Sequence, residues 1–246
     1  MPIFLVYHKI RDDAAQDAHA ISPHLLQEHL QAIRASGVPF LEPREFQPAQ
    51  NGVVITFDDG TPDHDTNVRP LLDKFGARAI FFVSTDQLDT AGHLTRAQVK
   101  ALQREGHVIG SHSHVHKRLD LMSPEQVREQ LATSAAVLAD LLGAPPAHLA
   151  PPRGGYDATV RAVAAETGYT FCRTMRWGYN RPLDPLAIEI APVTGAWGTW
   201  FLHEALRARN ERLVKTLFFL KLGLRDSLGP LDYRKIRNTV AKLARG

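Results

Sequence analysis

Two adjacent carboxylates are the first candidates for chemistry in this sequence. Asp58 and Asp59 directly follow the apolar run 53–57 and precede Gly60. Side by side after a buried strand, two carboxylates repel each other and lose solvent, so a positive group must stabilise them or one must take up a proton. The same tripeptide also suits an ordinary turn. Taken alone, these residues indicate either a reactive site or a turn.

Three histidines form the second candidate. His112, His114 and His116 occur within one short stretch directly after the apolar segment 107–110. One helical turn would bring His112 and His116 onto one face, whereas a strand would do so for His112 and His114. Two imidazoles and one carboxylate suit zinc or another first-row ion and leave coordination positions for water and substrate. The same ligand set is also typical of ferrous oxygenases.

The elements that must position these residues alternate between strands and helices. Apolar runs bounded by turn residues predict strands, and apolar residues at helical spacing after caps such as Ser22-Pro23 predict helices. The expected strands are 3–7, 53–57, 79–83, 107–110, one at 149, 169–172 and 188–193. The expected helices are 22–36, 66–75, 95–104, 123–142 and 157–167.

Repeated strand–helix units with fully apolar strands predict an α/β protein with a parallel sheet covered by helices. More than six such units favour a barrel over an open sheet, although spacing alone does not decide between them. In such barrels chemistry occurs where strands end. His8, at the end of the run 3–7, therefore joins the candidates, because the first strand of a closed barrel lies beside the last.

The composition limits the class of protein. Hydrophobic residues make up 44% of the 246 residues and charged residues 22%, which indicates one folded core. The net charge of +3 is mild and no nucleic-acid motif is present, so we expect no nucleic-acid partner. Cys172 is the only cysteine, so no intramolecular disulfide can form. The N-terminal run matches neither a signal peptide nor a membrane span, and we expect a cytoplasmic location.

These residues resemble the motifs of the polysaccharide deacetylase (NodB-homology) family. Thr56-Phe57-Asp58-Asp59-Gly60 is similar to the family's first motif, and the segment 112–116 fits its second, His-Ser/Thr-x-x-His. The resemblance covers about residues 3–195 and implies a distorted (β/α)7-type barrel. It also implies a metal-dependent hydrolase that removes an N-acyl group, normally acetyl, from an amino sugar of a glycan or of a lipid- or nucleotide-linked precursor.

The resemblance also implies roles for single residues. Asp58 would be the general base, and Asp59, His112 and His116 would hold a divalent metal, most often zinc, with cobalt, nickel, iron or manganese as alternatives. His114 falls on a variable position of the motif.

The later motifs depart from the family pattern. Ala150 stands where the third motif usually has an arginine, so Arg153 is a candidate for that charge, and the backbone N–H of Arg153 or Gly154 a candidate for an oxyanion site. The fourth motif is not evident, although Trp177 lies in the corresponding part of the chain and is a candidate sugar contact, as are Trp197 and Trp200.

The fifth motif, Leu-x-His, resembles the segment 201–203 poorly. The segment 5–10 instead resembles the opening of circularly permuted members, in which this strand comes first. We therefore expect His8 to be the general acid and His203 to be structural. Residues 1–195 would form the barrel domain, and residues 196–246 a basic helical extension packed on it. The basic tail could also lie against anionic lipid, which would give peripheral membrane contact.

Three other interpretations remain open at this point. The altered third and fourth motifs suit a glycan-binding protein with a vestigial site. A related amidohydrolase acting on a non-sugar C–N bond would carry the same residues. A ferrous oxygenase would need a 2-oxo-acid site and a different fold.

Overall fold

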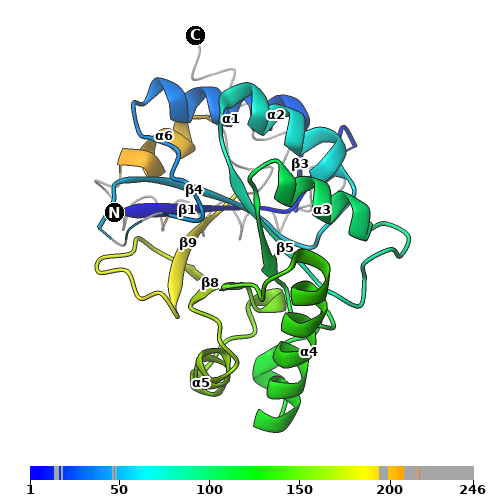
Figure 1. The fold of residues 1–246 in the computed structure, drawn as a ribbon. Coiled ribbons are helices and arrows are strands. Elements are labelled where there is room, and N and C mark those ends of the chain that lie inside the picture. The colour runs from blue at the N-terminus through cyan, green and yellow to red at the C-terminus, as the bar shows by residue number, and fades with distance from the viewer. Residues whose placement is uncertain are drawn as a thin grey trace.

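A closed barrel of parallel strands forms the centre of the molecule (Figure 1). The structure, a computed structural model, describes residues 1–13, 17, 19–45, 47, 49–193, 199–207 and 216. Within this part seven strands close in the order β1-β4-β5-β6-β7-β8-β9. Their bounds are β1 Pro2–Tyr7, β4 Gly52–Phe57, β5 Ala79–Val83, β6 Val108–Ser111, β7 His148–Leu149, β8 Phe171–Trp177 and β9 Ile188–Pro192. β1 pairs with both β4 and β9, which confirms the predicted (β/α)7-type barrel.

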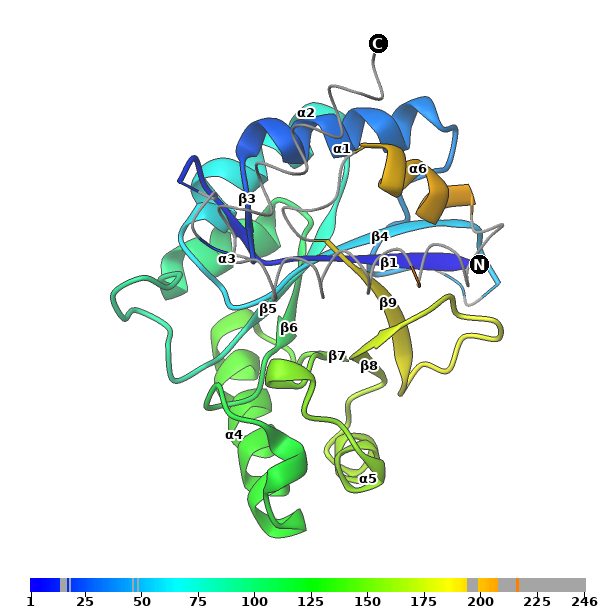
Figure 2. The ribbon, with the colours of Figure 1, turned by 180° about the vertical axis from the view of Figure 1, so that it is seen from behind.

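Helices cover the outside of this barrel in two groups. The helices are α1 Pro23–Ala35, α2 Arg69–Phe75, α3 Arg96–Arg104, α4 Pro124–Leu142, α5 Ala158–Glu166 and α6 Thr199–Arg207. Figures 1 and 2 show α1, α2, α3 and α6 on one side of the sheet and α4 and α5 on the opposite side. Shorter elements are β2 Lys9–Ile10, β3 Ala20–Ile21, the π-helix η2 His64–Val68, and the 3-10 turns η3 Leu119–Leu121 and η4 Pro152–Gly154.

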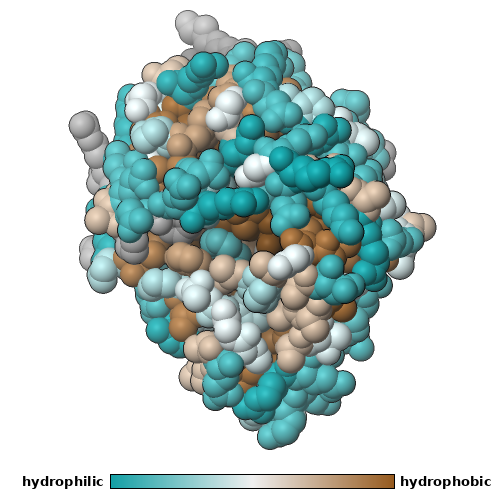
Figure 3. All heavy atoms as spheres, in the orientation of Figure 1, coloured by the Kyte–Doolittle hydropathy of each residue, from teal (hydrophilic) through white to brown (hydrophobic). Residues whose placement is uncertain are grey.

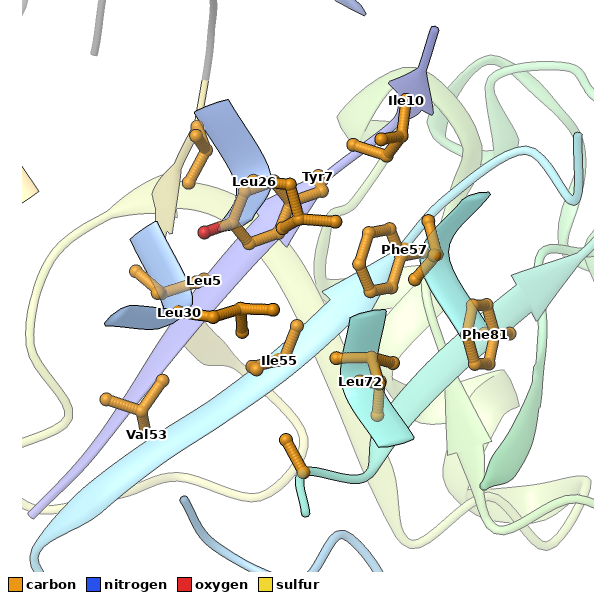
Figure 4. Close-up of a cluster of buried hydrophobic side chains, with 14 of the residues drawn as sticks. Leu5, Tyr7, Ile10, Leu26, Leu30, Val53, Ile55, Phe57, Leu72 and Phe81 are labelled. Atoms are coloured by element: carbon orange, nitrogen blue, oxygen red, sulfur yellow. The ribbon is translucent and has the colours of Figure 1, made fainter. Parts of the chain in front are cut away.

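Strand periodicity divides the apolar residues between two buried faces. Successive side chains of a strand point to opposite sides, so both faces of these strands are apolar. Residues 3, 5 and 7 of β1 belong to the cluster under the helices, whereas Phe4 and Val6 belong to the cluster inside the barrel. Figure 4 shows the outer cluster, in which Leu5 and Ile55 lie beside Leu30 of α1. The same alternation determines which residues reach the mouth of the barrel.

The predicted starts of α1 and α3 are confirmed by their caps. The Ser22 side chain accepts a hydrogen bond from the N–H of Leu25, and Pro23 occupies the first helical position. Thr95 and Gln98 form a capping box at the start of α3. These contacts satisfy backbone N–H groups that a helix leaves without partners at its first turn.

Two predicted elements need correction, and neither of the two conformations considered for the histidines is present. The predicted helix 66–75 is preceded and partly replaced by the π-helix η2. The predicted strand 169–172 begins at Phe171 and continues to Trp177. The histidines after β6 lie in a bent loop, not in a helix or strand, and Ser113 has a φ of 67° there.

The predicted C-terminal extension falls mostly outside the described residues. α6 is described and packs against α1, whereas the basic segment 208–246 lies outside the described part apart from Thr216. On the face shown in Figure 3, hydrophilic residues cover most of the surface and apolar ones are seen mainly in hollows. In the described part, the helices are too short or too polar to cross a bilayer.

Candidate active site

The two adjacent carboxylates occupy different environments. The Asp58 N–H donates to the Tyr7 carbonyl at 3.0 Å, which extends the ladder between β4 and β1, and the residue is 2% exposed. At Asp59 the backbone turns into the left-handed region with a φ of 72°, followed by Gly60 at 58°. Few non-glycine residues adopt this conformation, and those that do cluster at functional sites. The turn therefore separates the two side chains instead of stacking their charges.

Asp59 lies beside two of the three histidines. Its Oδ1 is 3.2 Å from Nε2 of His116 and 3.5 Å from Nε2 of His112. Burial alone would raise the pKa of Asp59, but hydrogen bonds from His112 and His116 outweigh it and hold that pKa well below its usual range. Asp59 is therefore a carboxylate in every ordinary buffer.

The ring of His112 is fixed by its second nitrogen. Nδ1 lies 2.6 Å from the carbonyl of Ala150, and because a carbonyl only accepts, Nδ1 carries the proton. Nε2 then faces Asp59 and is the ring atom left for a metal, because a partner on the other nitrogen orients a metal-binding histidine. The backbone is held as well, since Ser84 Oγ donates to the His112 carbonyl at 2.9 Å.

The donor set of this cluster fits a divalent cation. One ligand atom each from Asp59, His112 and His116 lies within 4.8 Å of the other two. A carboxylate and two imidazoles at a partly open position match a zinc or first-row metal site that keeps room for water.

A second group, Asp73, Glu105 and His107, has similar spacing but different surroundings. Arg69 pairs with Glu105 at 2.9 Å and Arg78 with Asp73 at 3.1 Å. His107 also uses Nδ1 to accept a hydrogen bond from the Ala79 N–H at 3.3 Å, so its Nε2 carries the proton. Two guanidinium charges and a protonated Nε2 oppose a cation there.

Asp58 is paired with an arginine from the far side of the barrel. Nη2 of Arg173 on β8 lies 2.6 Å from Oδ1 and 2.5 Å from Oδ2 of Asp58. Both residues are 2% exposed, and the guanidinium also stacks over the Phe82 ring at 5.1 Å. A buried carboxylate needs such a counter-charge to stay ionised.

His8 reaches the same mouth from the end of β1. Its Nε2 is 3.8 Å from Oδ2 of Asp58, and its ring lies 5.1 Å from that of His19. Burial lowers the pKa of His8, while the nearby Asp58 and Asp59 raise it and His19 lowers it further. Its Nδ1 is buried and makes no hydrogen bond within the described residues.

These groups share one pocket of about 470 Å³. Its lining includes His8, Asp58, Asp59, His112 and His116, together with Lys9, His19, Pro151, Arg153 and Met175. A second hollow of about 510 Å³ continues from Lys9, Asp59 and His116 toward Arg11 and His93. Both volumes are in the range of small-molecule sites.

Of the two candidates from the third motif, only Arg153 lines this pocket. Arg153 has a φ of 53°, and the charge beside Asp58 comes from Arg173 and not from Arg153. The Gly154 N–H donates to the Pro151 carbonyl at 3.3 Å, which makes it a weaker candidate for an oxyanion site.

Trp177 lies away from the pocket. It is 4% exposed and packs edge-on against Tyr179, with the ring centroids 5.4 Å apart, in the core under the helices. Trp197 lies outside the described residues, as does the side chain of Trp200.

Arg173 is the residue that sequence reasoning missed. The predicted strand ended at Cys172, one residue before Arg173, whereas β8 continues to Trp177. Cys172 belongs to the apolar cluster outside the barrel, and alternation therefore turns Arg173 inward. A charged residue on the inner face of an apolar strand was the signal that could have identified it.

The part of the chain that contains these site residues is similar to known proteins. The profile described as polysaccharide deacetylase matches residues 47–172, a segment that contains Asp58, Asp59, His112 and His116. A peptidoglycan-N-acetylglucosamine deacetylase of Bacillus cereus is 31% identical over 130 residues, covering 49% of this chain and 45% of the relative. The chain spans between 45% and 62% of the length of the first three curated relatives that it matches.

Solved structures share the fold over a larger part of the chain. The Streptococcus pyogenes deacetylase PplD, solved in complex with acetate, has a TM-score of 0.75 and 25% identity over 83% of this chain and 97% of its own. IcaB from Ammonifex degensii has a TM-score of 0.74 and 24% identity over 85% of this chain and 97% of its own.

Proposed function

Because the chain belongs to the polysaccharide deacetylase family, we propose that it is a metal-dependent hydrolase that removes an N-acetyl group from an amino sugar. The observation that carries the proposal is the convergence of Asp59, His112 and His116 on one point beside Asp58. The same arrangement argues against a vestigial glycan-binding site, which would have no need to keep both the donor set and a charge-paired carboxylate.

The proposed metal site consists of Asp59, His112 and His116, with zinc as the proposed ion. A divalent cation there would lower the pKa of water and polarise the acetyl carbonyl. The side chains supply the remaining steps. Asp58, paired with Arg173, accepts a proton from the water whose oxygen bonds to the acetyl carbon.

His8 is the proposed proton donor to the departing amine. As the C–N bond breaks, the nitrogen takes a proton from His8, and the products are acetate and a free amino sugar. Oδ2 of Asp58 lies 3.8 Å from Nε2 of His8, so the His8 ring must move closer to Asp58 before the proton taken from water passes to it. The Arg153 N–H is the proposed contact to the oxyanion, an interaction worth about 3–4 kcal/mol in comparable sites.

The proposed substrate is an amino-sugar glycan or a lipid- or nucleotide-linked precursor of one. The names of the relatives support this class, since one acts on peptidoglycan N-acetylglucosamine and another, from Pestalotiopsis, is a chitin deacetylase. The acetate held by PplD supports acetyl as the group released. Contact of the basic tail with anionic lipid stays a prediction.

Paired substitutions test this assignment. We expect Asp59→Ala to lose both metal and acetate release from a short chitin-type oligosaccharide. Asp58→Asn should keep the metal and lower kcat by about 10²–10⁴-fold, as expected for loss of a general base. Metal content and acetate are measured on the same preparations. Near-wild-type turnover by Asp58→Asn would contradict the mechanism, and a wild-type protein that binds no metal after reconstitution would favour the glycan-binding interpretation.

A further inference from the structure

The backbone around His8 is held by side chains from the π-helix that follows the Asp58–Gly60 turn. His64 is fully buried, and its Nε2 lies 2.8 Å from the carbonyl oxygen of His8. Because a carbonyl only accepts, Nε2 of His64 carries the proton and donates it. Burial lowers the pKa of His64, so its ring remains neutral. Its one ring proton then stays on Nε2, where it is donated to the His8 carbonyl.

Two further bonds hold the next peptide groups. Oδ2 of Asp63 accepts from the Ile10 N–H at 2.5 Å, and Nδ2 of Asn67 donates to the Ile10 carbonyl at 2.7 Å. Asp63 is the N-cap of η2, and His64 and Asn67 lie within it. Three side chains of one short element therefore fix the main chain from His8 to Ile10, and π-helical turns of this kind often occur at functional sites.

The His8 ring itself has little to hold it. Its Nδ1 is buried without a hydrogen bond among the described residues, and its Nε2 lies 3.8 Å from Asp58, beyond hydrogen-bond range. A histidine that transfers a proton is usually oriented by a partner on its second nitrogen. At His8 the orientation must come instead from the main chain and from packing against His19.

We propose that Asp63, His64 and Asn67 form a positioning clamp that sets the His8 imidazole at the mouth of the barrel. This inference rests on the proposed function, in which His8 protonates the leaving amine. The clamp residues act through His8 and do not touch the substrate. Their loss should therefore slow proton transfer to the leaving group and leave the metal site intact.

The test compares two leaving groups. An amine must be protonated to leave, whereas the phenolate of an activated aryl acetate leaves without a proton. His64→Phe keeps an aromatic ring between Phe57 and Phe81, whose centroids lie 5.4 and 5.5 Å from that of His64, but removes the donor. We expect it to lower kcat for acetate release from the chitin-type oligosaccharide at least 10-fold. The rate with the aryl acetate and the metal content should change less than about 2-fold.

Matched variants make the outcome specific. His64→Gln, which retains a donor, should recover most of the rate, and Asn67→Ala should act like His64→Phe if the latter fails to fold. Asp65→Asn is the control, because Asp65 lies in the same π-helix but contacts Arg69 and Gln98. In a His8→Ala background, His64→Phe should have no further effect on kcat, since both changes act on one step.

Equal losses with both substrates, or an undiminished effect in the His8→Ala background, would overturn the clamp and leave the proposed function standing. A wild-type protein that cleaves the aryl acetate but releases no acetate from any glycan would overturn the proposed function itself.

Discussion

The ion pair between Asp58 and Arg173 is the most deeply buried charge contact in the candidate site. Each partner is 2% exposed, and the guanidinium is surrounded by Phe82, Met175 and the carboxylate. Such a pair adds little net stability compared with apolar residues, but breaking it leaves one buried charge alone. Arg173 therefore supplies the counter-charge beside the buried Asp58, and we expect the site to tolerate loss of both partners better than loss of one.

Arg173→Met tests this coupling through stability. We expect the free energy of unfolding at pH 7, measured by urea denaturation with a chelator present, to fall by about 3–5 kcal/mol. The double variant with Asp58→Asn should recover part of that loss, because no charge is then left buried and unpaired. Strictly additive losses would contradict the pairing. Arg173→Lys should retain partial activity, since a lysine supplies the charge without the planar fork of guanidinium nitrogens.

At the scale of elements, β1 and α6 offer two alternative histidines. His8 directly follows β1, a barrel strand whose C-terminal end lies at the pocket. His203 lies on α6 in a hollow with Ala35, Ser36 and Val38 at the end of α1, and this hollow shares no lining residue with the pocket. The strand that closes the barrel, and not the helix that covers it, delivers a histidine to the site.

We therefore expect His8→Ala to lower kcat for the oligosaccharide by about 10²–10⁴-fold, as loss of a general acid does. His203→Ala should leave kcat within about 2-fold of wild type. Steady-state acetate release by the two variants, at equal metal content, checks the expectation. A loss of turnover in His203→Ala with the fold intact, or none in His8→Ala, would reassign the proton donor.

The elements were largely predictable because their signals are local. Apolar runs and caps such as Ser22-Pro23 act within a few residues, and the barrel follows from their alternation. The site needed longer-range information. His112 and His116 meet because the chain bends at Ser113, whereas the sequence spacing had suggested a helical turn as one way to bring them together. Arg173 contacts Asp58 from β8, a strand that is distant in sequence. The predicted strand ended at residue 172, and this boundary error left Arg173 outside the set of candidates.

For the molecule as a whole, buried neutral histidines link stability to pH. Burial lowers the pKa of His148 from 6.5 to about 4, and its ring stacks on Phe171 with the centroids 4.7 Å apart. Below pH 6.5, His148 therefore binds a proton in the unfolded chain. In the folded chain it does so only near pH 4. Stability is complete above the unfolded value and is lost as the pH falls between these two values, by up to about 3 kcal/mol for this one group.

His148→Phe should remove this contribution while keeping an aromatic ring beside Phe171. Between pH 7.5 and 5 we expect the free energy of unfolding of the variant to fall by about 2 kcal/mol less than that of wild type. Urea denaturation across the pH range, with a chelator present, measures the difference. His24→Gln is the control, because the His24 side chain is 80% exposed and should not change the slope. Parallel pH profiles for His148→Phe and wild type would show that His148 is not responsible.

The central claim is that one divalent cation at Asp59, His112 and His116 makes the barrel a deacetylase. Titration of zinc into metal-stripped protein, with acetate release from the chitin-type oligosaccharide followed at each addition, tests it most directly. We predict a rate that rises linearly and levels off at one equivalent of metal per chain, with no rise in Asp59→Ala. A stripped protein as active as the reconstituted one, or an Asp59→Ala variant that responds like wild type, would contradict the account.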